Sequence, residues 1–343
     1  MVDGTPSGAP GPSPSPSASR GPTDAAPPPK WPPDPSPQPA APALHNATAA
    51  EIAAAKADND KGVVHGSESK GKTDRTMDQL LPEKPVIKDG KAQLGNLTVE
   101  ADKYPQFREA MMHESKNPEM NALVERLEKG PYKTNVTTNE VSNNEMEPQM
   151  NGNAEVHWDP KHMHVASNDA KRSPATRLAH ELDHADEWTH NPQRLITNAN
   201  TPDDKFSNLE EKRVITGSER RNVKAIGEGQ REDHSAGKGE FNSKGVTSAV
   251  PVLHQTRGGV TTELADGYNQ TGKISVDGDN IKQDIGRGQS VNYPRAEFEG
   301  LVGKNAVDQA VAGGKPVTVA VQGGEFKMQE PRAVAQEVQH SGR

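Results

Sequence analysis

The 343-residue chain is 31% hydrophobic and 3% aromatic, with a mean hydropathy of −0.90, so we expect a modest folded domain flanked by loose segments. Its formal net charge of −8, without any run of lysine or arginine, argues against a nucleic-acid partner, and no apolar run approaches the roughly 18 residues of a membrane span. Because cysteine is absent, thiolate sites are excluded and any metal ion must be bound by His, Asp or Glu.

Residues 1–90 are predicted to form a disordered leader and linker. The first 45 residues contain 15 of the 29 prolines, with Ser, Ala and Gly between them, which is typical of an extended, unfolded chain. The segment 47–84 is polar and charged, and we expect at most one frayed helix in it. The leader can serve in secretion, as a ligand for proline-binding modules, or as a spacer. It lacks the basic and apolar regions of a secretory signal, so any export must use another route.

Residues 91–240 are predicted to form the main folded domain. Order should begin near Leu94 with a strand in NLTVEAD, followed by two amphipathic helices that are interrupted at Asn117-Pro118. YKTNVTT and AEVHWD are predicted strands, and HMHVAS should pair with AEVHWD as a hairpin. The clearest helix start of the chain follows in SPATRLAHELDHADEWTH, where Ser173 can cap the helix and a proline occupies its first turn.

A second helix is predicted in SNLEEKRVITGSERRNVKAIG, after a loop rich in Asn, Pro and Asp. Residues 241–343 then change to short β-like pieces (VTSAVPVL, GGVTTEL, KISVDG), a helix near 297–312, a strand PVTVAVQ and a last short helix. We expect a C-terminal extension of unknown role, either a small β-rich domain or a loosely ordered tail.

The stretch HELDHADEWTH, from His180 to His190, contains an HExxH pattern. Residues four apart lie on one face of a helix, so His180 and His184 can bind one zinc ion through imidazole nitrogens. Glu181 is then placed to act as general base on a zinc-bound water. A chance HExxH in a chain this long has a probability on the order of 3%, and the capped helix around it strengthens the zinc interpretation. The alternative is a solvated helix with two surface histidines.

His190 is one candidate for the third ligand. It lies six residues after His184, which is the metzincin spacing, but Glu187 stands where metzincins have a helix-breaking glycine. On a continuous helix the His190 side chain would point roughly 240° around the axis from His184, away from the metal. The only methionine after the motif is Met328, so a Met-turn is also missing. His190 is therefore kept as an alternative.

A glutamate of the second predicted helix is the preferred third ligand. Glu211 precedes the apolar Val214 and Ile215 by three and four residues, whereas Glu210 is four before only one of them, so Glu211 should share the buried face better. A buried carboxylate needs a cation, and zinc can supply one. Glu210 stays an alternative ligand, and the other interpretation of Glu211 is a surface carboxylate paired with a basic neighbour. Glu219, further along this face, could orient a ligand histidine.

Arg231 and His234, which lie further along the chain in GQREDHSAG, are candidates for stabilising the oxyanion that forms when water attacks a peptide carbonyl. The alternative is that both residues belong to an exposed polar loop. The histidines at 157, 162 and 164 lie on the predicted hairpin and are interpreted as polar strand residues. In a zincin, this hairpin is where a substrate would add as an extra strand.

These motifs resemble the NleD-like type III effector zinc metalloproteases. The resemblance covers about residues 94 to 240 and rests on QFREAMMHESKNPEMNALVERLEKG, AEVHWDPKHMHV, SPATRLAHELDHA and NLEEKRVITGSERRNVKAIGEGQREDH. It implies an α+β fold: a zincin-like, gluzincin-type metallopeptidase domain with an HExxH helix, a small β-sheet and a glutamate-bearing helix. It also implies delivery through a type III needle into the host cell cytoplasm and cleavage of host signalling proteins, with mitogen-activated protein kinases as the family's substrate class.

By position, the resemblance implies that His180, His184 and a glutamate of the 210/211 pair bind zinc and that Glu181 is catalytic. The chain departs from the family in two places. Asp183 stands where glycine is commoner, which adds a negative charge near the metal. His234 stands where a tyrosine often follows the arginine, which puts the transfer of that tyrosine's role in doubt.

Together these features predict a secreted bacterial effector that acts as a zinc-dependent endopeptidase on host proteins, with one zinc ion per chain. The implied partners are a host protein substrate and a type III secretion chaperone, with neither nucleic acid nor a membrane span. Two alternatives stay open. One is a non-catalytic effector that binds host proteins through its proline-rich leader, and the other is a metallopeptidase toxin that acts on competing bacteria.

Overall fold

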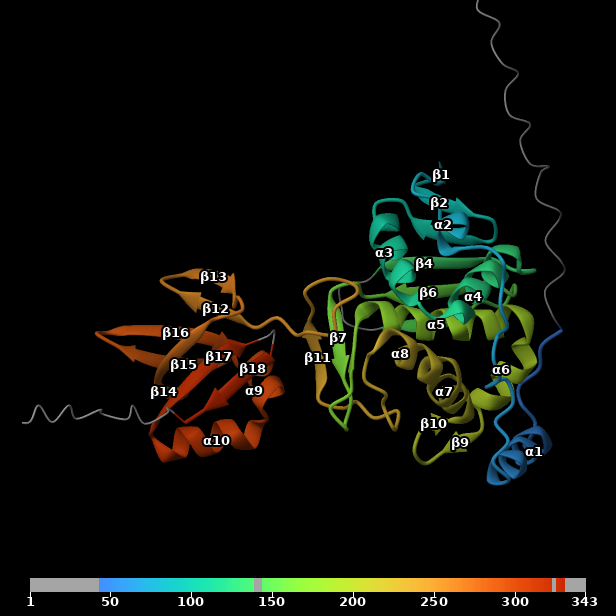
Figure 1. Ribbon diagram of the computed structural model, residues 1–343. Coiled ribbons are helices and arrows are strands. Elements are labelled where there is room, and N and C mark those ends of the chain that lie inside the picture. The colour runs from blue at the N-terminus through green and yellow to red at the C-terminus, as the bar shows by residue number, and fades with distance from the viewer. Residues whose placement is uncertain (1–42, 139–143, 323–324, 331–343) are drawn as a thin grey trace, which may run out of the picture. The chain divides into compact units, whose positions relative to one another are not determined.

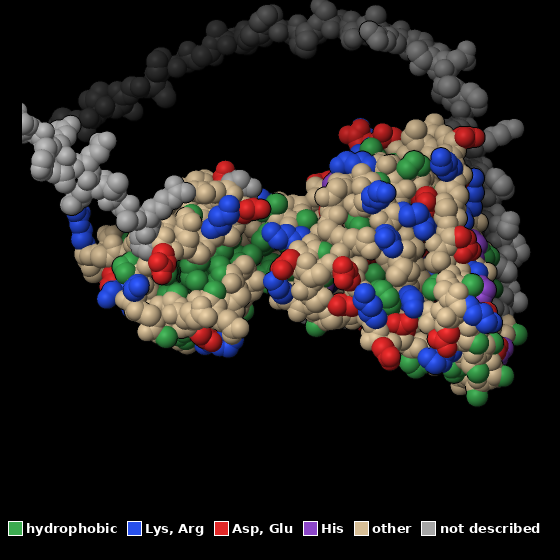
Figure 2. All heavy atoms as spheres, turned by 60° about the horizontal axis from the view of Figure 1, so that its bottom comes forward, with side chains coloured by type: hydrophobic (Ala, Val, Ile, Leu, Met, Phe, Trp, Pro, Cys, Tyr) green, Lys and Arg blue, Asp and Glu red, His purple; other side chains and the backbone are tan. Residues whose placement is uncertain are grey.

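The computed structural model describes residues 43–138, 144–322 and 325–330 (Figure 1). Nearly all of the proline-rich leader and the last short helix of the sequence prediction lie outside the described residues. Within the described ranges, no helix combines the length and the apolar character that crossing a membrane requires. On the face drawn in Figure 2, Lys and Arg side chains are interspersed with Asp and Glu side chains, so that face carries mixed charge.

The sequence patterns predict that ordered structure begins near Leu94, but the first described helix lies well before that residue. The helix α1 (Ala49–Asp60) starts with a capping box, and the short helix α2 (Met77–Leu80) starts with another. Residues 43–90 are thus more ordered than the predicted linker, because a few apolar side chains suffice to anchor them. Three of these side chains are buried in the main hydrophobic core: Met77, Leu80 and Leu81.

Among the described residues, six strands form the main sheet, in the order β1-β2-β3-β4-β6-β5. Figure 1 labels β1, β2, β4 and β6 of this sheet. β3, β4 and β6 are parallel, and the other pairs are antiparallel. The helices α3 and α4 share one core with this sheet, and they are interrupted at Asn117-Pro118 as predicted. The bounds are β1 Val86–Lys88, β2 Lys91–Leu94, β3 Leu97–Glu100, α3 Tyr104–Glu114, α4 Pro118–Lys129, β4 Thr134–Thr138, β5 Glu145–Pro148 and β6 Ala154–Trp158.

The predicted hairpin between AEVHWD and HMHVAS is wrong. β6 has β4 on one side and β5 on the other, so both of its edges are already paired. The next strand, β7 (His162–Val165), therefore joins a second, three-stranded sheet with β8 (Lys171–Arg172) and β11 (Gly239–Asn242). β11 comes from far along the chain, and no local pattern could indicate this pairing.

The helix α5 (Pro174–His190) is central to the structure. Its start is as predicted: the Ser173 side chain accepts a hydrogen bond from the backbone N–H of Thr176, and Pro174 occupies the first position. Every residue from Pro174 to Thr189 is buried, including both histidines of the motif. The alternative of a solvated helix with two surface histidines is therefore excluded. The polar groups of this helix must instead be satisfied by the protein around it.

The predicted second helix contains a π-helical turn. It consists of α7 (Leu209–Val214), the π-turn η1 (Ile215–Glu219) and α8 (Arg220–Ile226). A π-turn closes i to i+5 hydrogen bonds and rotates the chain less per residue than an α-helix, so it realigns the residues that follow it. The elements before it are α6 (Pro192–Ala199) and the short strands β9 (Pro202–Asp203) and β10 (Ser207–Asn208).

The residues from His254 onward form a seven-stranded antiparallel sheet with its own hydrophobic core, in the order β13-β12-β16-β15-β14-β17-β18. The predicted β-like piece 246–253 contains only an isolated bridge, between Pro251 and Ser243. The bounds are β12 His254–Arg257, β13 Val260–Glu263, β14 Asn269–Asp277, β15 Asn280–Gly286, β16 Gln289–Pro294, α9 Arg295–Val302, α10 Lys304–Gly313, β17 Pro316–Gln322 and β18 Glu325–Gln329.

Candidate metal centre

The side chains of His180, His184 and Glu211 converge from α5 and α7 and can hold a metal ion. The two Nε2 atoms lie 3.0 Å apart. Oε2 of Glu211 lies 3.2 Å from Nε2 of His180, and its Oε1 lies 3.4 Å from Nε2 of His184. The geometry therefore brings together two imidazole nitrogens and one carboxylate, a ligand set that suits zinc among other divalent metals.

Each histidine is oriented by a carboxylate on the far side of its ring. Nδ1 of His180 lies 2.8 Å from Oε2 of Glu219, and Nδ1 of His184 lies 2.9 Å from Oε1 of Glu210. An ionised carboxylate only accepts hydrogen bonds, so Nδ1 donates in both cases. In the neutral rings this leaves a lone pair on each Nε2, directed toward the other histidine and Glu211. Such an outer carboxylate is typical of histidines that bind a metal.

The electrostatics of the cluster favour a cation. Burial lowers the pKa of His180, but the carboxylates of Glu211 and Glu219 outweigh it and raise the pKa above its usual value. For His184, Glu211 and Glu210 likewise outweigh burial and raise the pKa. Among the described residues, Oε2 of Glu211 is buried without a hydrogen-bond partner, because its approaches to His180 and His234 lack hydrogen-bond geometry. A field that stabilises a proton on these nitrogens also stabilises a metal ion, so the donor set fits one.

The two orienting carboxylates are themselves paired with buried arginines. Nη2 and Nε of Arg213 lie 2.7 and 2.9 Å from the two oxygens of Glu210. Arg231 donates to both oxygens of Glu219, at 2.9 and 2.8 Å, and Arg172 approaches the same carboxylate at 3.3 Å. A buried carboxylate without such partners would be strongly destabilising. These contacts place Arg231, a predicted oxyanion stabiliser, behind His180 as a partner of Glu219.

His234, the other predicted oxyanion stabiliser, faces the cluster. Its Nε2 lies 3.3 Å from Oε2 of Glu211, and its Nδ1 lies 3.0 Å from Oγ of Ser207. The side chain is 37% exposed, so it is accessible from solvent, unlike the two motif histidines. His234 therefore stands at the open side of the cluster.

A cavity of about 560 Å³ opens onto the cluster. Glu181 lies on its wall beside the two histidines and is 8% exposed. The strand β5 contributes to the same wall, together with a group of arginine and histidine side chains: His164, Arg172, Arg177, Arg231 and His234. The cavity can thus bring a ligand to Glu181 and the candidate metal ligands at the same time.

Not every predicted candidate joins the cluster. His190 ends α5 away from it, where Nδ1 lies 3.3 Å from Oδ1 of Asp186 and also contacts the Asp186 carbonyl. Glu210 contacts the outer nitrogen of His184 rather than the inner one. The burial argument that ranked Glu211 above Glu210 has the wrong sign, because the Glu210 side chain is 5% exposed and that of Glu211 is 19%. Glu211 faces the cavity, which explains its greater exposure.

His164 has a role that the sequence interpretation missed. It is buried on the cavity wall, and Nη2 of Arg172 lies 2.7 Å from its Nδ1. Burial and the neighbouring charge of Arg172 lower the pKa of His164 to about 3, so it is neutral and accepts from the guanidinium. By contrast, His162 and His157 bond to Asp159 and Thr137, as expected for polar strand residues.

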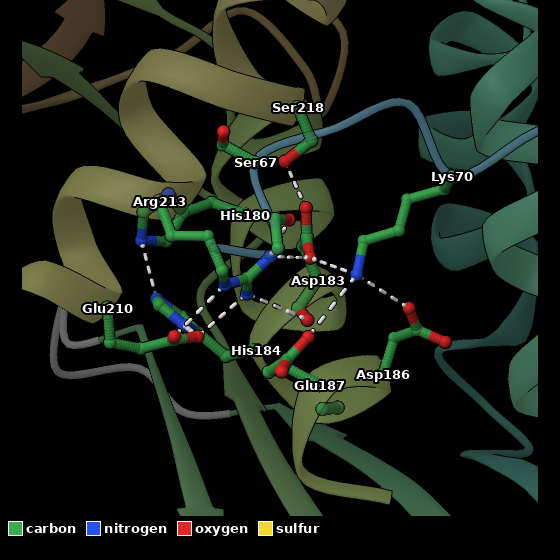
Figure 3. A network of polar contacts seen from close by, with 12 residues as sticks. Ser67, Lys70, His180, Asp183, His184, Asp186, Glu187, Glu210, Arg213 and Ser218 are labelled. Atoms are coloured by element: carbon green, nitrogen blue, oxygen red, sulfur yellow. Dashed lines mark hydrogen bonds and ion pairs between the residues drawn. The ribbon is translucent and has the colours of Figure 1, made fainter. Parts of the chain in front are cut away.

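A network behind α5 was also missed. Asp183, Asp186 and Glu187 are all buried on the side away from the cavity, where Lys70, Arg126, Arg194 and Arg213 neutralise them. Figure 3 shows Lys70 and Arg213 with the three acids. The spacing of the acids at i, i+3 and i+4 marks one helix face, and this was the available signal. Three of their cationic partners, Lys70, Arg126 and Arg213, are distant in sequence, so pattern alone could not identify them.

The chain was also compared with known proteins. No protein-family model, no curated protein and no solved structure matches it.

Proposed function

We propose that this chain is a zinc-dependent endopeptidase in which His180, His184 and Glu211 bind the metal and Glu181 is the general base. The observation that carries the proposal is the convergence of these three ligand side chains, with both histidines oriented by an outer carboxylate. Glu181 lies on the wall of the same cavity, which supports its role in the reaction.

When bound, zinc supplies Lewis acidity, which polarises a peptide carbonyl and acidifies water. Glu181 takes the proton from the attacking water and passes it to the leaving amine. His234 stands at the open side of the cluster and donates a hydrogen bond to the oxyanion as charge develops on the carbonyl oxygen. Glu219 and Glu210 hold the two ligand histidines in the orientation and tautomer that metal binding needs.

An extended peptide is the substrate that best fits the cavity wall. β5 is the last strand of the main sheet in the described residues, so its outer edge has no strand partner there, and it borders the cavity. A peptide can add to such an edge through main-chain hydrogen bonds, while its side chains enter the cavity. Host signalling proteins as substrates, and type III delivery, stay predictions of the sequence resemblance.

The test compares wild-type protein with Glu181→Gln. We expect the wild type to contain one zinc per chain by metal analysis and to cleave proteins in a proteomic search of host-cell extract. Glu181→Gln should retain zinc and lose cleavage by at least about 100-fold, because the base is missing while the ligands are intact. Full cleavage by the variant would remove Glu181 as the base, and a zinc-free wild type whose host-cell effect survives the substitution would favour the non-catalytic effector.

A further inference from the structure

A short segment of the N-terminal region lies against the back of the metal centre. It comprises Val64–Lys70 (VHGSESK), here called the strap. Its backbone carbonyls are bound by arginines from the folded domain: Nη1 of Arg221 donates to Ser67 at 2.9 Å, and Nη1 of Arg126 donates to Lys70 at 2.5 Å. Arg213, which also holds Glu210, reaches the carbonyl of Gly66 at 3.4 Å. The strap is therefore held by hydrogen bonds from these arginines to its backbone carbonyls.

Two glycines allow this close approach. Gly66 has φ +81°, and a Cβ on it would lie 2.9 Å from Cδ of Arg213. Gly217, in the π-turn, has no space for a Cβ either, because one would lie 2.9 Å from the carbonyl oxygen of Ser67. The strap thus packs directly against the Arg213 side chain and the turn that carries Glu219.

Lys70 ends the strap and points into the acidic face of α5 (Figure 3). Its Nζ lies 3.4 Å from Asp183, 3.1 Å from Asp186 and 3.6 Å from Glu187, and its side chain is 12% exposed. Burial lowers the pKa of Lys70, but Asp183 and Asp186 outweigh it and raise the pKa, so the ammonium stays charged. The ammonium offsets negative charge that would otherwise be buried directly behind the motif histidines.

An unbroken set of contacts connects the strap with a candidate metal ligand. The Gly66 carbonyl and Oδ1 of Asp183 both accept from Nη1 of Arg213, at 3.4 and 2.7 Å. Arg213 in turn holds both oxygens of Glu210, and Glu210 lies 2.9 Å from Nδ1 of His184. Arg213 is 1% exposed, so these protein partners, rather than solvent, hold its guanidinium in place.

We infer that the strap is a working part of the metal centre: through Arg213 and Glu210 it positions His184 for metal binding. This inference rests on the proposed function, because it concerns the same metal. It makes the strap a positioning element whose displacement weakens metal binding, although none of its residues touches the candidate ligands. Loss of an outer partner of a metal-bound histidine typically lowers affinity by about 10- to 100-fold.

Gly66→Ala tests the inference without changing any charge. The new Cβ has to displace Arg213, so we expect zinc affinity, measured by competition with a chelator, to fall by about 10-fold or more. Gly62→Ala is the matched control: Gly62 has φ +82°, the same backbone strain, but a Cβ there meets nothing within 4 Å. Its zinc affinity should equal that of the wild type. In the double variant with Glu210→Gln, the effect of Gly66→Ala should largely disappear, because both act through one path.

Hydrogen exchange of the wild type provides a second readout that does not depend on a variant folding. Coupling is reciprocal, so zinc should slow exchange of the strap amides while leaving α1 unchanged. Two outcomes would overturn the strap inference and leave the proposed function intact. One is equal zinc affinity of Gly66→Ala and Gly62→Ala, and the other is amide exchange of the strap at the same rate with and without zinc. A wild-type protein that binds no zinc overturns both.

Discussion

Glu210 and Glu211 are adjacent in the chain, yet their carboxylates contact opposite nitrogens of one imidazole ring. Oε1 of Glu210 lies 2.9 Å from Nδ1 of His184, and Oε1 of Glu211 lies 3.4 Å from Nε2. The two neighbours therefore differ in kind. Glu211 is positioned as a candidate metal ligand, and Glu210 is positioned to orient the candidate ligand His184.

Substitution of the three candidate third ligands should separate these roles. Glu211→Ala should lose bound zinc almost completely, because an inner carboxylate is removed. Glu210→Ala should weaken zinc by about 10- to 100-fold. His190→Ala should leave zinc content unchanged, since His190 contacts Asp186 instead. Metal analysis after dialysis measures all three, and zinc loss with His190→Ala alone would show that the ligand assignment is wrong.

His234→Phe should lower kcat by about 100-fold while zinc content stays at the wild-type level, because the hydrogen bond to the oxyanion is lost and the ligands remain. Ser207→Ala, which removes only the contact that orients Nδ1 of His234, should have a smaller effect. Steady-state kinetics on a cleavable peptide and metal analysis are the two measurements. Loss of zinc from His234→Phe would instead make His234 a ligand.

Arg231→Lys should weaken zinc binding by several-fold. Lysine keeps the charge but cannot reproduce the two-pronged contact with Glu219, so the hold on His180 loosens. The control is Arg220→Lys, an exposed position on α8. If zinc affinity is unchanged while kcat falls, Arg231 acts on the substrate, as the sequence interpretation first suggested.

Glu114→Gln should change the pH dependence of stability. Glu114 is fully buried against Thr176, Asn222 and Glu228, and burial raises its pKa from 4.5 to about 8. Folding therefore favours the protonated form of Glu114. The contribution of this carboxyl to the stability of the fold is fully present below pH 4.5 and is lost as the pH rises through 8.

The Gln variant stays neutral, so its free energy of unfolding should rise relative to that of the wild type between pH 5 and pH 8.5. The rise should be on the order of a few kcal/mol, at about 1.36 kcal/mol per pKa unit. Urea unfolding at the two pH values measures the difference. Glu109→Gln, at an exposed position of the same helix, is the control and should show none. An unchanged gap between wild type and Glu114→Gln would contradict the raised pKa.

The sequence by itself determined what depends on short-range periodicity. The cap at Ser173 marked the start of α5, and four-residue spacing put His180 and His184 on one face. The second helix could also be predicted, with Glu211 as a candidate metal ligand and Glu219 as a residue that orients a ligand histidine. The π-turn that aligns Glu219 could not be predicted. These features are encoded within a few residues of where they occur, so pattern alone can detect them.

Only the tertiary structure decided how buried charge is compensated and which strands pair. Lys70 was assigned to a linker, yet it neutralises acids of α5 more than a hundred residues away. β7 joined β11 rather than β6, because both edges of β6 were occupied. The ranking of Glu210 against Glu211 by burial had the wrong sign. Glu211 is exposed to the cavity, whereas Glu210 is buried against Arg213. Ion pairs and strand partners of this kind depend on distances between remote segments, which exist only after the chain has packed.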